Sequence, residues 1–190
     1  MPKTASTTDN AKISAAALRL ASAKGWQSLT LDAVAKTAKI PLATLKKRFN
    51  APSELAPIIA EEIDHMAFAH TGKPTGTPHD ILFDLLMARF DILQKNRQAI
   101  LSMAEAARTD RALSCALARA ITDGAYRLID AANLKTSSRL VLALGLMAVY
   151  SWAFYAWRKD KSPDMAKTMA ALDRALRLAN KVSEILKPKI

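Results

Sequence analysis

Apolar side chains recur every three or four residues through most of this chain, which is the periodicity of helices with one buried face. The first such stripe predicts a helix over residues 10–24 that ends at Gly25, a typical helix stop. A second stripe begins after Thr30, a typical N-cap residue, and predicts a short helix that ends near Lys39. Pro41 prevents that helix from continuing, because a residue that precedes proline is pushed out of the α region.

A third short helix is predicted to start near Leu42 and to carry Leu45 and Phe49 on its buried stripe. Two short helices joined by a tight turn and packed on a longer first helix form a helix-turn-helix unit. The outward positions of the third helix combine small residues with cations: Ala43, Thr44, Lys46, Lys47 and Arg48. Small side chains let a helix approach the DNA major groove closely, and flanking cations suit phosphate contacts, so this face is a candidate nucleic-acid interface.

Helical spacing continues after this unit, broken by one clear loop at residues 71–79. Pro57 lies early in the fourth helix and predicts a kink or a delayed start there. For the last helix, Ser162 is the predicted N-cap and Pro163 the first helical residue. The ranges predicted for the helices after the third are 52–70, 80–95, 98–107, 110–132, 137–159 and 163–186.

The composition agrees with a helical chain, since only five of the 190 residues are glycine and 6% are aromatic. We therefore predict an all-α fold of two domains. Residues 1–52 form the three-helix helix-turn-helix head, and residues 53–190 form a larger helical domain.

Positive charge is concentrated at the two ends of the chain, whose net charge is +11 at pH 7. Residues 1–53 carry nine Lys and Arg but two acidic residues, whereas residues 54–157 carry ten and eleven. Residues 158–190 again have a surplus, nine against four. A single lysine usually only solvates a helix face, but a surplus this local indicates a polyanionic partner. Nucleic acid is the first candidate and an anionic membrane surface the second.

A resemblance to TetR-type transcriptional regulators rests on three runs of residues: G-W-Q-S-L-T-L-D-A-V-A (25–35), A-K-I-P-L-A-T-L-K-K-R-F (38–49) and E-L (54–55). It covers about residues 10–60. The resemblance implies a nine- or ten-helix fold, a head that binds double-stranded DNA, a pocket for a small apolar effector in the larger domain, and dimerisation through the last two helices. It implies a cytoplasmic, ligand-responsive repressor that binds a near-palindromic operator as a homodimer.

By matched position in that family, Thr30 caps the second helix beside a phosphate, and Ala43 and Thr44 enter the major groove. Lys46 takes the place of the family's usual phosphate-binding tyrosine. The sequence also departs from the family pattern at Pro41 and Ala43, where the family commonly has Ser and Gly.

The resemblance places the effector pocket among the fourth to eighth helices, where Met and aromatic side chains suit an adaptable apolar site. The candidate lining residues are Phe83, Met87, Phe90, Met103, Arg119, Thr122 and Tyr126, with ordinary core packing as the alternative for each. The tail at residues 157–176 is similar both to TetR-like proteins and to a lipid-binding ubiquinone-biosynthesis protein of the same fold. A carrier of a lipid or quinone precursor, with a head that does not bind DNA, is therefore the alternative function.

The segment at residues 140–157, L-V-L-A-L-G-L-M-A-V-Y-S-W-A-F-Y-A-W, is apolar on every side. Its length reaches the lower limit for a membrane span, but we favour a helix that is buried on one side by its own domain and on the other by a second subunit. We therefore predict a homodimer and no insertion into a membrane. The candidate interface residues are Met147, Tyr150, Trp152, Tyr155, Leu172 and Leu176.

Enzyme chemistry has little support in the sequence, which has no glycine-rich phosphate loop, no H-E-x-x-H motif and no pair of cysteines. We predict no catalytic residue, cofactor or metal. Glu61 and His65 share a helix face, but no third ligand accompanies them, so a solvated face is the favoured interpretation. The single Cys115 cannot form an internal disulfide, and the N-terminus has no apolar signal-peptide core; both observations fit a reducing cytoplasm.

Overall fold

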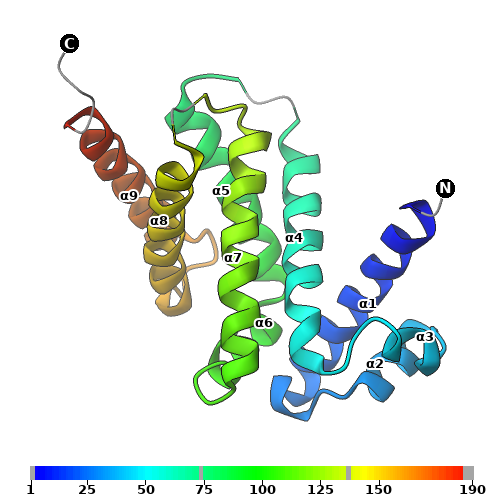
Figure 1. The fold of residues 1–190 in the computed structure, drawn as a ribbon. Coiled ribbons are helices and arrows are strands. Elements are labelled where there is room, and N and C mark those ends of the chain that lie inside the picture. The colour runs from blue at the N-terminus through cyan, green and yellow to red at the C-terminus, as the bar shows by residue number, and fades with distance from the viewer. Residues whose placement is uncertain (1–2, 73–74, 136–137, 186–190) are drawn as a thin grey trace. The chain divides into compact units, whose positions relative to one another are not determined.

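The computed structural model describes residues 3–72, 75–135 and 138–185. Every regular element in these ranges is a helix and none is a β-strand (Figure 1), so the predicted all-α fold is confirmed. The α-helices are α1 (Lys3–Lys24), α2 (Leu31–Ala38), α3 (Leu42–Lys46), α4 (Ala56–Thr71), α5 (Pro78–Lys95), α6 (Arg97–Ala106), α7 (Arg111–Ala131), α8 (Arg139–Lys159) and α9 (Ala166–Ile185). Two short 3₁₀ helices, η1 (Trp26–Ser28) and η2 (Pro52–Leu55), precede α2 and α4.

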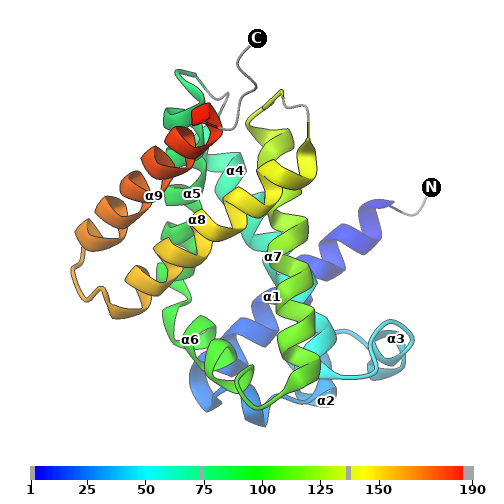
Figure 2. The ribbon, with the colours of Figure 1, turned by 60° about the vertical axis from the view of Figure 1, so that its left-hand side comes forward.

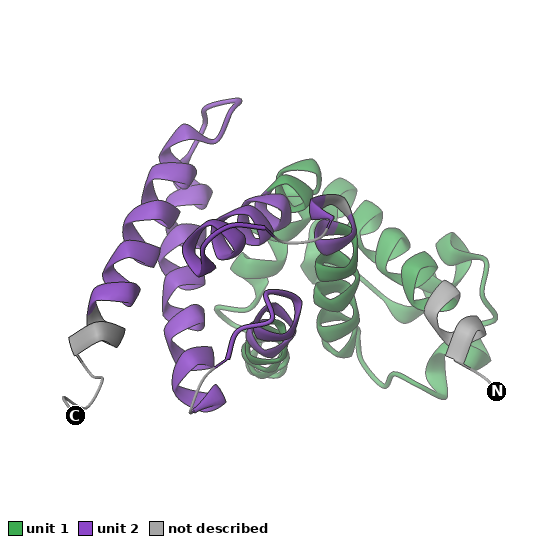
Figure 3. Cartoon of the chain, turned by 90° about the horizontal axis from the view of Figure 1, so that it is seen from above, with its two compact units in different colours: residues 1–66, 91–124 green, residues 67–90, 125–190 purple. Residues whose placement is uncertain are grey.

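The chain forms two compact units (Figure 3). Unit 1 comprises residues 1–66 and 91–124, and unit 2 comprises residues 67–90 and 125–190. Within unit 1, α1 packs against α2 and also against α6, so the three-helix head shares its first helix with the next layer. The predicted domain boundary at residue 52 lies inside unit 1, and the independence of the head stays a prediction.

The core of unit 1 is built on the buried face of α1. Ile13 and Ala17 of α1, Val34 of α2 and Leu45 of α3 are all essentially inaccessible to solvent. Burial of an apolar side chain of this kind stabilises a fold by about 1.5–3 kcal/mol, and helices as short as α2 and α3 are not stable alone. Tertiary packing therefore holds them. α1 begins seven residues earlier than predicted, at Lys3, because its first residues are polar and give no apolar stripe.

Prolines set the connection from α3 to α4. α3 ends at Lys46, earlier than predicted, and Phe49 lies in the turn that follows it, still buried. The chain then forms η2, and α4 begins only at Ala56. The delayed start predicted from Pro57 is confirmed, because proline suits the first turn of a helix, where its missing N–H has no partner to lose.

The predicted start of α9 is wrong by three residues, since the helix begins at Ala166 rather than at Pro163. Met165 has a φ of 53°, a left-handed conformation that separates the Ser162–Asp164 turn from the helix. Ser162 Oγ nevertheless accepts a hydrogen bond from the backbone N of Ala166 at 3.2 Å. A methionine in this conformation has no local sequence signal.

Asp160 joins the end of α8 to the beginning of α9. Its Oδ2 accepts hydrogen bonds from the backbone N and the hydroxyl of Thr168, both at 2.8 Å. Its Oδ1 accepts from the backbone N of Ser162 at 3.0 Å and from the Ser162 hydroxyl. Burial alone would raise the pKa of this carboxyl, but the hydrogen bonds from Ser162 and Thr168 outweigh it and hold the pKa of Asp160 well below its usual range.

An aromatic cluster occupies the inner side of α8 in unit 2. Phe90 of α5 and Trp157 of α8 are fully buried, and the Phe90 ring stacks on Tyr150 at 5.7 Å between centroids. Phe154 lies 5.3 Å from Trp157 by the same measure. The guanidinium of Arg89 lies 4.6 Å from the centroid of Tyr150 and donates a hydrogen bond to its hydroxyl. One side of α8 is therefore core.

The other side of α8 is largely uncovered. Within the described ranges, α8 is the one helix that is long and apolar enough to cross a membrane, and 28% of its most apolar stretch is buried in the subunit. Length and composition are weak evidence for a membrane span, because buried helices of other proteins share them.

Candidate nucleic-acid interface

Two caps and a proline set the direction of α3. Thr30 Oγ1 accepts a hydrogen bond from the backbone N of Ala33 at 3.1 Å and so caps α2, as predicted. Lys39 ends α2 with a φ of 57°. Pro41 follows, and its carbonyl accepts from the backbone N of Thr44 at 2.9 Å to begin α3. The fixed φ of proline fits this position, although it supplies no side-chain cap.

The structure places all six predicted DNA-contact residues at exposed positions: Thr30, Ala43, Thr44, Lys46, Lys47 and Arg48. On the opposite side of α3, Leu45 is 0% exposed and Phe49 is 7% exposed, and these two side chains anchor the helix to the head. Figure 2 shows α3 at the outer edge of unit 1, beside α2. A short helix that is anchored from behind and uncovered in front is free to meet a partner.

Arg48 differs from its two lysine neighbours, because its guanidinium is already engaged. One nitrogen donates a hydrogen bond to Asn10 Oδ1 of α1, and the group lies 5.0 Å from the centroid of the Phe49 ring. The bond joins residues 38 apart in the chain, so local spacing gave no signal for it. Lys46 and Lys47 are therefore the cations of α3 with the greater freedom to reach a phosphate.

The surroundings of α3 are strongly positive. No acidic residue occurs between Asp32 and Glu54, whereas five Lys and Arg do. Asp32 pairs with Lys36 at 3.0 Å, and the Glu54 carboxylate accepts from the backbone N of Asn50 at 3.1 Å. Because both flanking carboxylates have partners of their own, the cations of α3 act on their surroundings without a neutralising neighbour in sequence.

The seven residues predicted to line an effector pocket are divided between the units. Unit 1 holds Met103, Arg119 and Thr122, and unit 2 holds Phe83, Met87, Phe90 and Tyr126. Phe90 belongs to the buried aromatic cluster, and Arg119 is exposed and pairs with Asp123 at 3.7 Å. The guanidinium of Arg139 lies 5.7 Å from the ring centroid of Tyr126. A shared role of the seven in ligand binding stays a prediction.

Large apolar side chains on α8 and α9 remain 55–63% exposed: Leu140, Val141, Leu144, Trp152, Tyr155 and Leu178. We call this set the α8–α9 apolar surface. Val141, Leu144, Trp152 and Tyr155 follow one another at helical spacing through the exposed Ala148, so they form one stripe. Such a stripe on the surface of a protein indicates an interaction site.

The predicted interface residues fall into two groups. Trp152 and Tyr155 belong to the α8–α9 apolar surface, and Met147 is half-buried. The other three face inward, because Tyr150 contacts Arg89 while Leu172 and Leu176 are buried within the subunit. The periodicity of α9 identified its apolar face correctly but did not show that α8 of the same subunit covers it.

The Glu61–His65 pair does not gain a metal-binding neighbour. Both side chains are exposed on α4. Among the residues that the structure describes, no group of three His, Cys, Asp or Glu side chains is close enough to hold a metal ion. Cys115 is exposed on α7.

Comparison with known proteins rests on structure, because no family model and no curated protein matches the sequence. A TetR transcriptional regulator from Nitrosomonas europaea superposes with a TM-score of 0.70 at 19% identity, covering 90% of this chain and 98% of the other. A TetR regulator from Rhodococcus sp. RHA1 gives 0.67 at 19% identity, with 92% and 95% covered. The multidrug binding protein EbrR, complexed with imidazole, gives 0.53 at 23% identity, with 86% and 87% covered. The chain therefore has the fold of TetR-family transcriptional regulators.

Proposed function

We propose that this chain is a ligand-responsive transcriptional regulator that binds a near-palindromic DNA operator as a homodimer in the cytoplasm. The observation that carries the proposal is α3, a short helix anchored by Leu45 and Phe49 that turns exposed small and cationic residues outward. The fold is that of DNA-binding regulators, and the charge surplus of the head supplies the attraction to phosphates.

The roles on DNA follow from the chemistry of each side chain. Ala43 and Thr44 are small enough for close approach to base edges, and Lys47 shares their outward face. Lys46 contacts phosphates, as does Thr30 at the beginning of α2. Arg48 supports the phosphate side while it holds Asn10 of α1. Pro41 and Lys46 replace the residue types that the family commonly has there, so the detailed geometry of the contacts is particular to this chain.

Homodimerisation follows from the α8–α9 apolar surface. An exposed stripe of leucine, valine, tryptophan and tyrosine is unfavourable in water and is satisfied by a second copy of the same stripe across a two-fold axis. Two heads related by such an axis match half-sites about 34–36 Å apart on DNA. The same burial removes the need for a membrane around α8.

A small apolar effector is the proposed signal. A ligand among α4 to α8 that binds one dimer geometry better than another shifts the population of dimers able to span both half-sites, and so releases DNA. Repression with release on ligand binding is the direction that this arrangement favours.

One observation favours a second function, a carrier of lipids or quinone precursors. The exposed apolar surface of α8 and α9 and the basic tail would suit such a protein as well as a dimer. A carrier would not need α3 to bind DNA, so DNA binding separates the two proposals.

A salt titration tests the proposed function. Purified protein is mixed with labelled DNA from around its own gene and with random DNA of equal length, over a range of salt concentrations. A regulator gives a logarithm of the binding constant that falls linearly and steeply with the logarithm of the salt concentration, and an affinity for the specific site about 10³-fold or more above that for random DNA. A carrier shows no such preference and is purified with bound lipid, which would contradict the proposal.

A further inference from the structure

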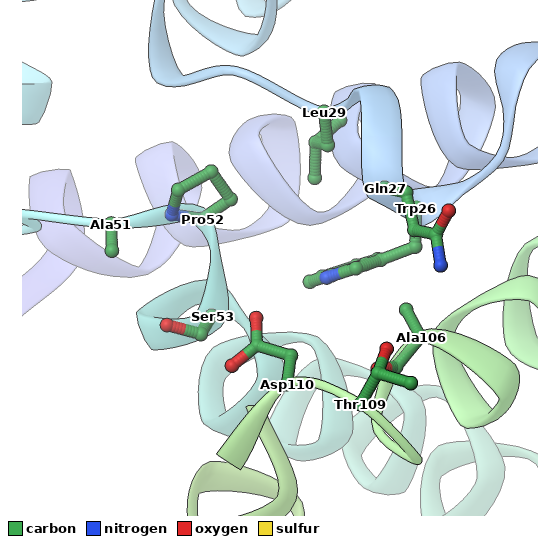
Figure 4. Close-up of a pocket in the computed structure, with 9 residues that line it drawn as sticks. All are labelled: Trp26, Gln27, Leu29, Ala51, Pro52, Ser53, Ala106, Thr109 and Asp110. Atoms are coloured by element: carbon green, nitrogen blue, oxygen red, sulfur yellow. The ribbon is translucent and has the colours of Figure 1, made fainter. Parts of the chain in front are cut away.

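A pocket of about 400 Å³ lies in unit 1, apart from the residues predicted to bind the effector. Figure 4 shows the side chains around it. The pocket is lined by Trp26, Gln27, Leu29, Ala51, Pro52, Ser53, Ala106, Thr109 and Asp110. Its volume is within the range of sites for small organic ligands.

The walls of this pocket come from three connecting segments. The first contains η1 and joins α1 to α2, the second joins α3 to η2, and the third joins α6 to α7. The first two are the segments that attach the α2–α3 pair to the rest of unit 1. The backbone N of Trp26 also donates to Ser102 Oγ of α6 at 3.2 Å, which fixes the first segment on α6. A ligand in the pocket would touch both attachments of the α2–α3 pair.

Two buried residues on these walls carry polar groups that have no partner. Trp26 is 4% exposed, and its indole N–H makes no hydrogen bond to any residue that the structure describes. Ser53 is 7% exposed, and the same holds for its hydroxyl. Figure 4 shows the indole extending into the space between Pro52 and Asp110, with its nitrogen near the leading end. Polar groups of buried residues are normally paired, so these two indicate that the pocket receives a hydrogen-bonding guest.

Asp110 supplies a negative wall opposite those groups. Its Oδ1 accepts from the backbone N of Leu113 at 3.0 Å, which caps α7 and fixes the carboxylate. The second oxygen remains available to an N–H donor. The pocket therefore presents an indole N–H and a hydroxyl for an acceptor, a carboxylate oxygen for a donor, and flat apolar surface from Trp26 and Pro52.

We propose that this pocket binds a small planar amino-heterocycle. The ring lies against Trp26 and Pro52, a ring nitrogen accepts from the indole N–H or the Ser53 hydroxyl, and an exocyclic amine donates to Asp110. A purely apolar ligand leaves all three groups unsatisfied, and a carboxylic acid is repelled by Asp110. The inference rests on unit 1 alone and does not depend on DNA binding.

Adenine is a suitable probe, because it has ring acceptors and an exocyclic amine, and purine is its matched control without the amine. In protein labelled with ¹⁵N, the three tryptophans give three indole N–H cross-peaks, and the one absent from the Trp26→Phe variant belongs to Trp26. We expect adenine to shift that cross-peak saturably at concentrations below about 5 mM, and purine to bind about tenfold or more weakly. Trp152 and Trp157 should not move.

Variants of the walls make the test specific. Asp110→Asn keeps a good helix cap and removes the charge, so it should erase most of the difference between adenine and purine. Ser53→Ala should weaken adenine severalfold, whereas Ser22→Ala, an exposed change on α1, should not. If Trp26→Phe fails to fold, Trp152→Phe and Trp157→Phe assign the remaining cross-peak by elimination. No shift at Trp26 up to about 5 mM adenine, or equal shifts by adenine and purine in the wild type, overturns the proposal.

Discussion

α3 and α8 are both uncovered, but their exposed surfaces are of opposite chemistry. α3 is five residues long, hides its apolar side chains and exposes lysines. α8 is 21 residues long, exposes leucine, tryptophan and tyrosine along its middle, and carries its cations only at its two ends. The first surface suits a polyanion and the second an apolar partner, so one chain displays two interfaces that respond differently to salt.

The two interfaces are expected to depend on each other. A five-residue helix covers too little DNA for tight binding, so two copies must bind together, and the α8–α9 apolar surface is what pairs them in our proposal. Rising salt weakens the DNA contacts of α3 through counterion release but leaves hydrophobic pairing intact. Breaking the pairing should therefore have a larger effect than removing any one side chain of α3.

Trp152→Glu should convert the dimer to monomer. The indole is 61% exposed in the single subunit, so the change does not disturb the core, but in a dimer it would bury an unpaired carboxylate. We expect the dimer dissociation constant to rise by about 100-fold or more, measured by sedimentation, with a parallel loss of operator affinity. Ala118→Glu, the same type of change at an exposed position of α7, is the control and should remain dimeric. A monomeric wild type at micromolar concentration would end the proposal of a dimer.

Substitutions on α3 should separate base recognition from phosphate binding. Thr44→Ala or Lys47→Ala should reduce the preference for operator over random DNA by about 1–3 kcal/mol for each base that the side chain no longer reaches. Lys46→Ala should instead weaken binding to all DNA and reduce the salt slope by about one unit for each phosphate left without its lysine. All three side chains are exposed, so thermal unfolding should hardly change. Unchanged affinity and preference in all three variants would show that α3 does not read DNA.

Much of this architecture follows from local sequence rules. Apolar periodicity located the helices, Thr30 was recognised as a cap, and Pro57 predicted the delayed start of α4. The outward face of α3 also followed from periodicity, because fixing Leu45 and Phe49 inside leaves the other positions outside.

The features that sequence reasoning missed depend on residues far apart in the chain. The bond from Arg48 to Asn10 and the cover that α8 gives to Leu172 arise only in the folded protein. The polar beginning of α1 and the left-handed Met165 have no pattern to reveal them. The Trp26 pocket likewise brings together three segments that no motif connects.

Asp160→Asn tests the buried junction that positions α9 against α8. We expect unfolding to become easier by about 1–3 kcal/mol near neutral pH, because an amide replaces an acceptor of the Thr168 and Ser162 donors. The pKa of Asp160 is lowered in the folded state, so its contribution is present above the ordinary carboxyl pKa of about 4 and is lost as the pH falls below that value.

The pH dependence supplies the control for that variant. Chemical unfolding at several pH values should show the wild type losing more stability than Asp160→Asn between about pH 5 and pH 2. Asp130 and Asp173 also have lowered pKa values, through Arg139 and Arg177 respectively, and remain in both proteins, so the difference between the two curves isolates Asp160. Parallel curves would show that the Asp160 hydrogen bonds do not favour its ionised form.

Thr30→Ala should have the smallest effect, and it compares the two regions on equal terms. Thr30 caps α2 at 3.1 Å and Ser138 caps α8 at 3.4 Å. Loss of an N-cap costs about 1 kcal/mol, and the longer bond of Ser138 should cost less. Thr30→Ser keeps the hydroxyl and should preserve stability, as measured by chemical unfolding. In the DNA assay, Thr30→Ala should lower affinity for every sequence, whereas Ser138→Ala should leave it unchanged. If both alanine variants weaken DNA binding equally, Thr30 acts through stability alone and lies away from the phosphates.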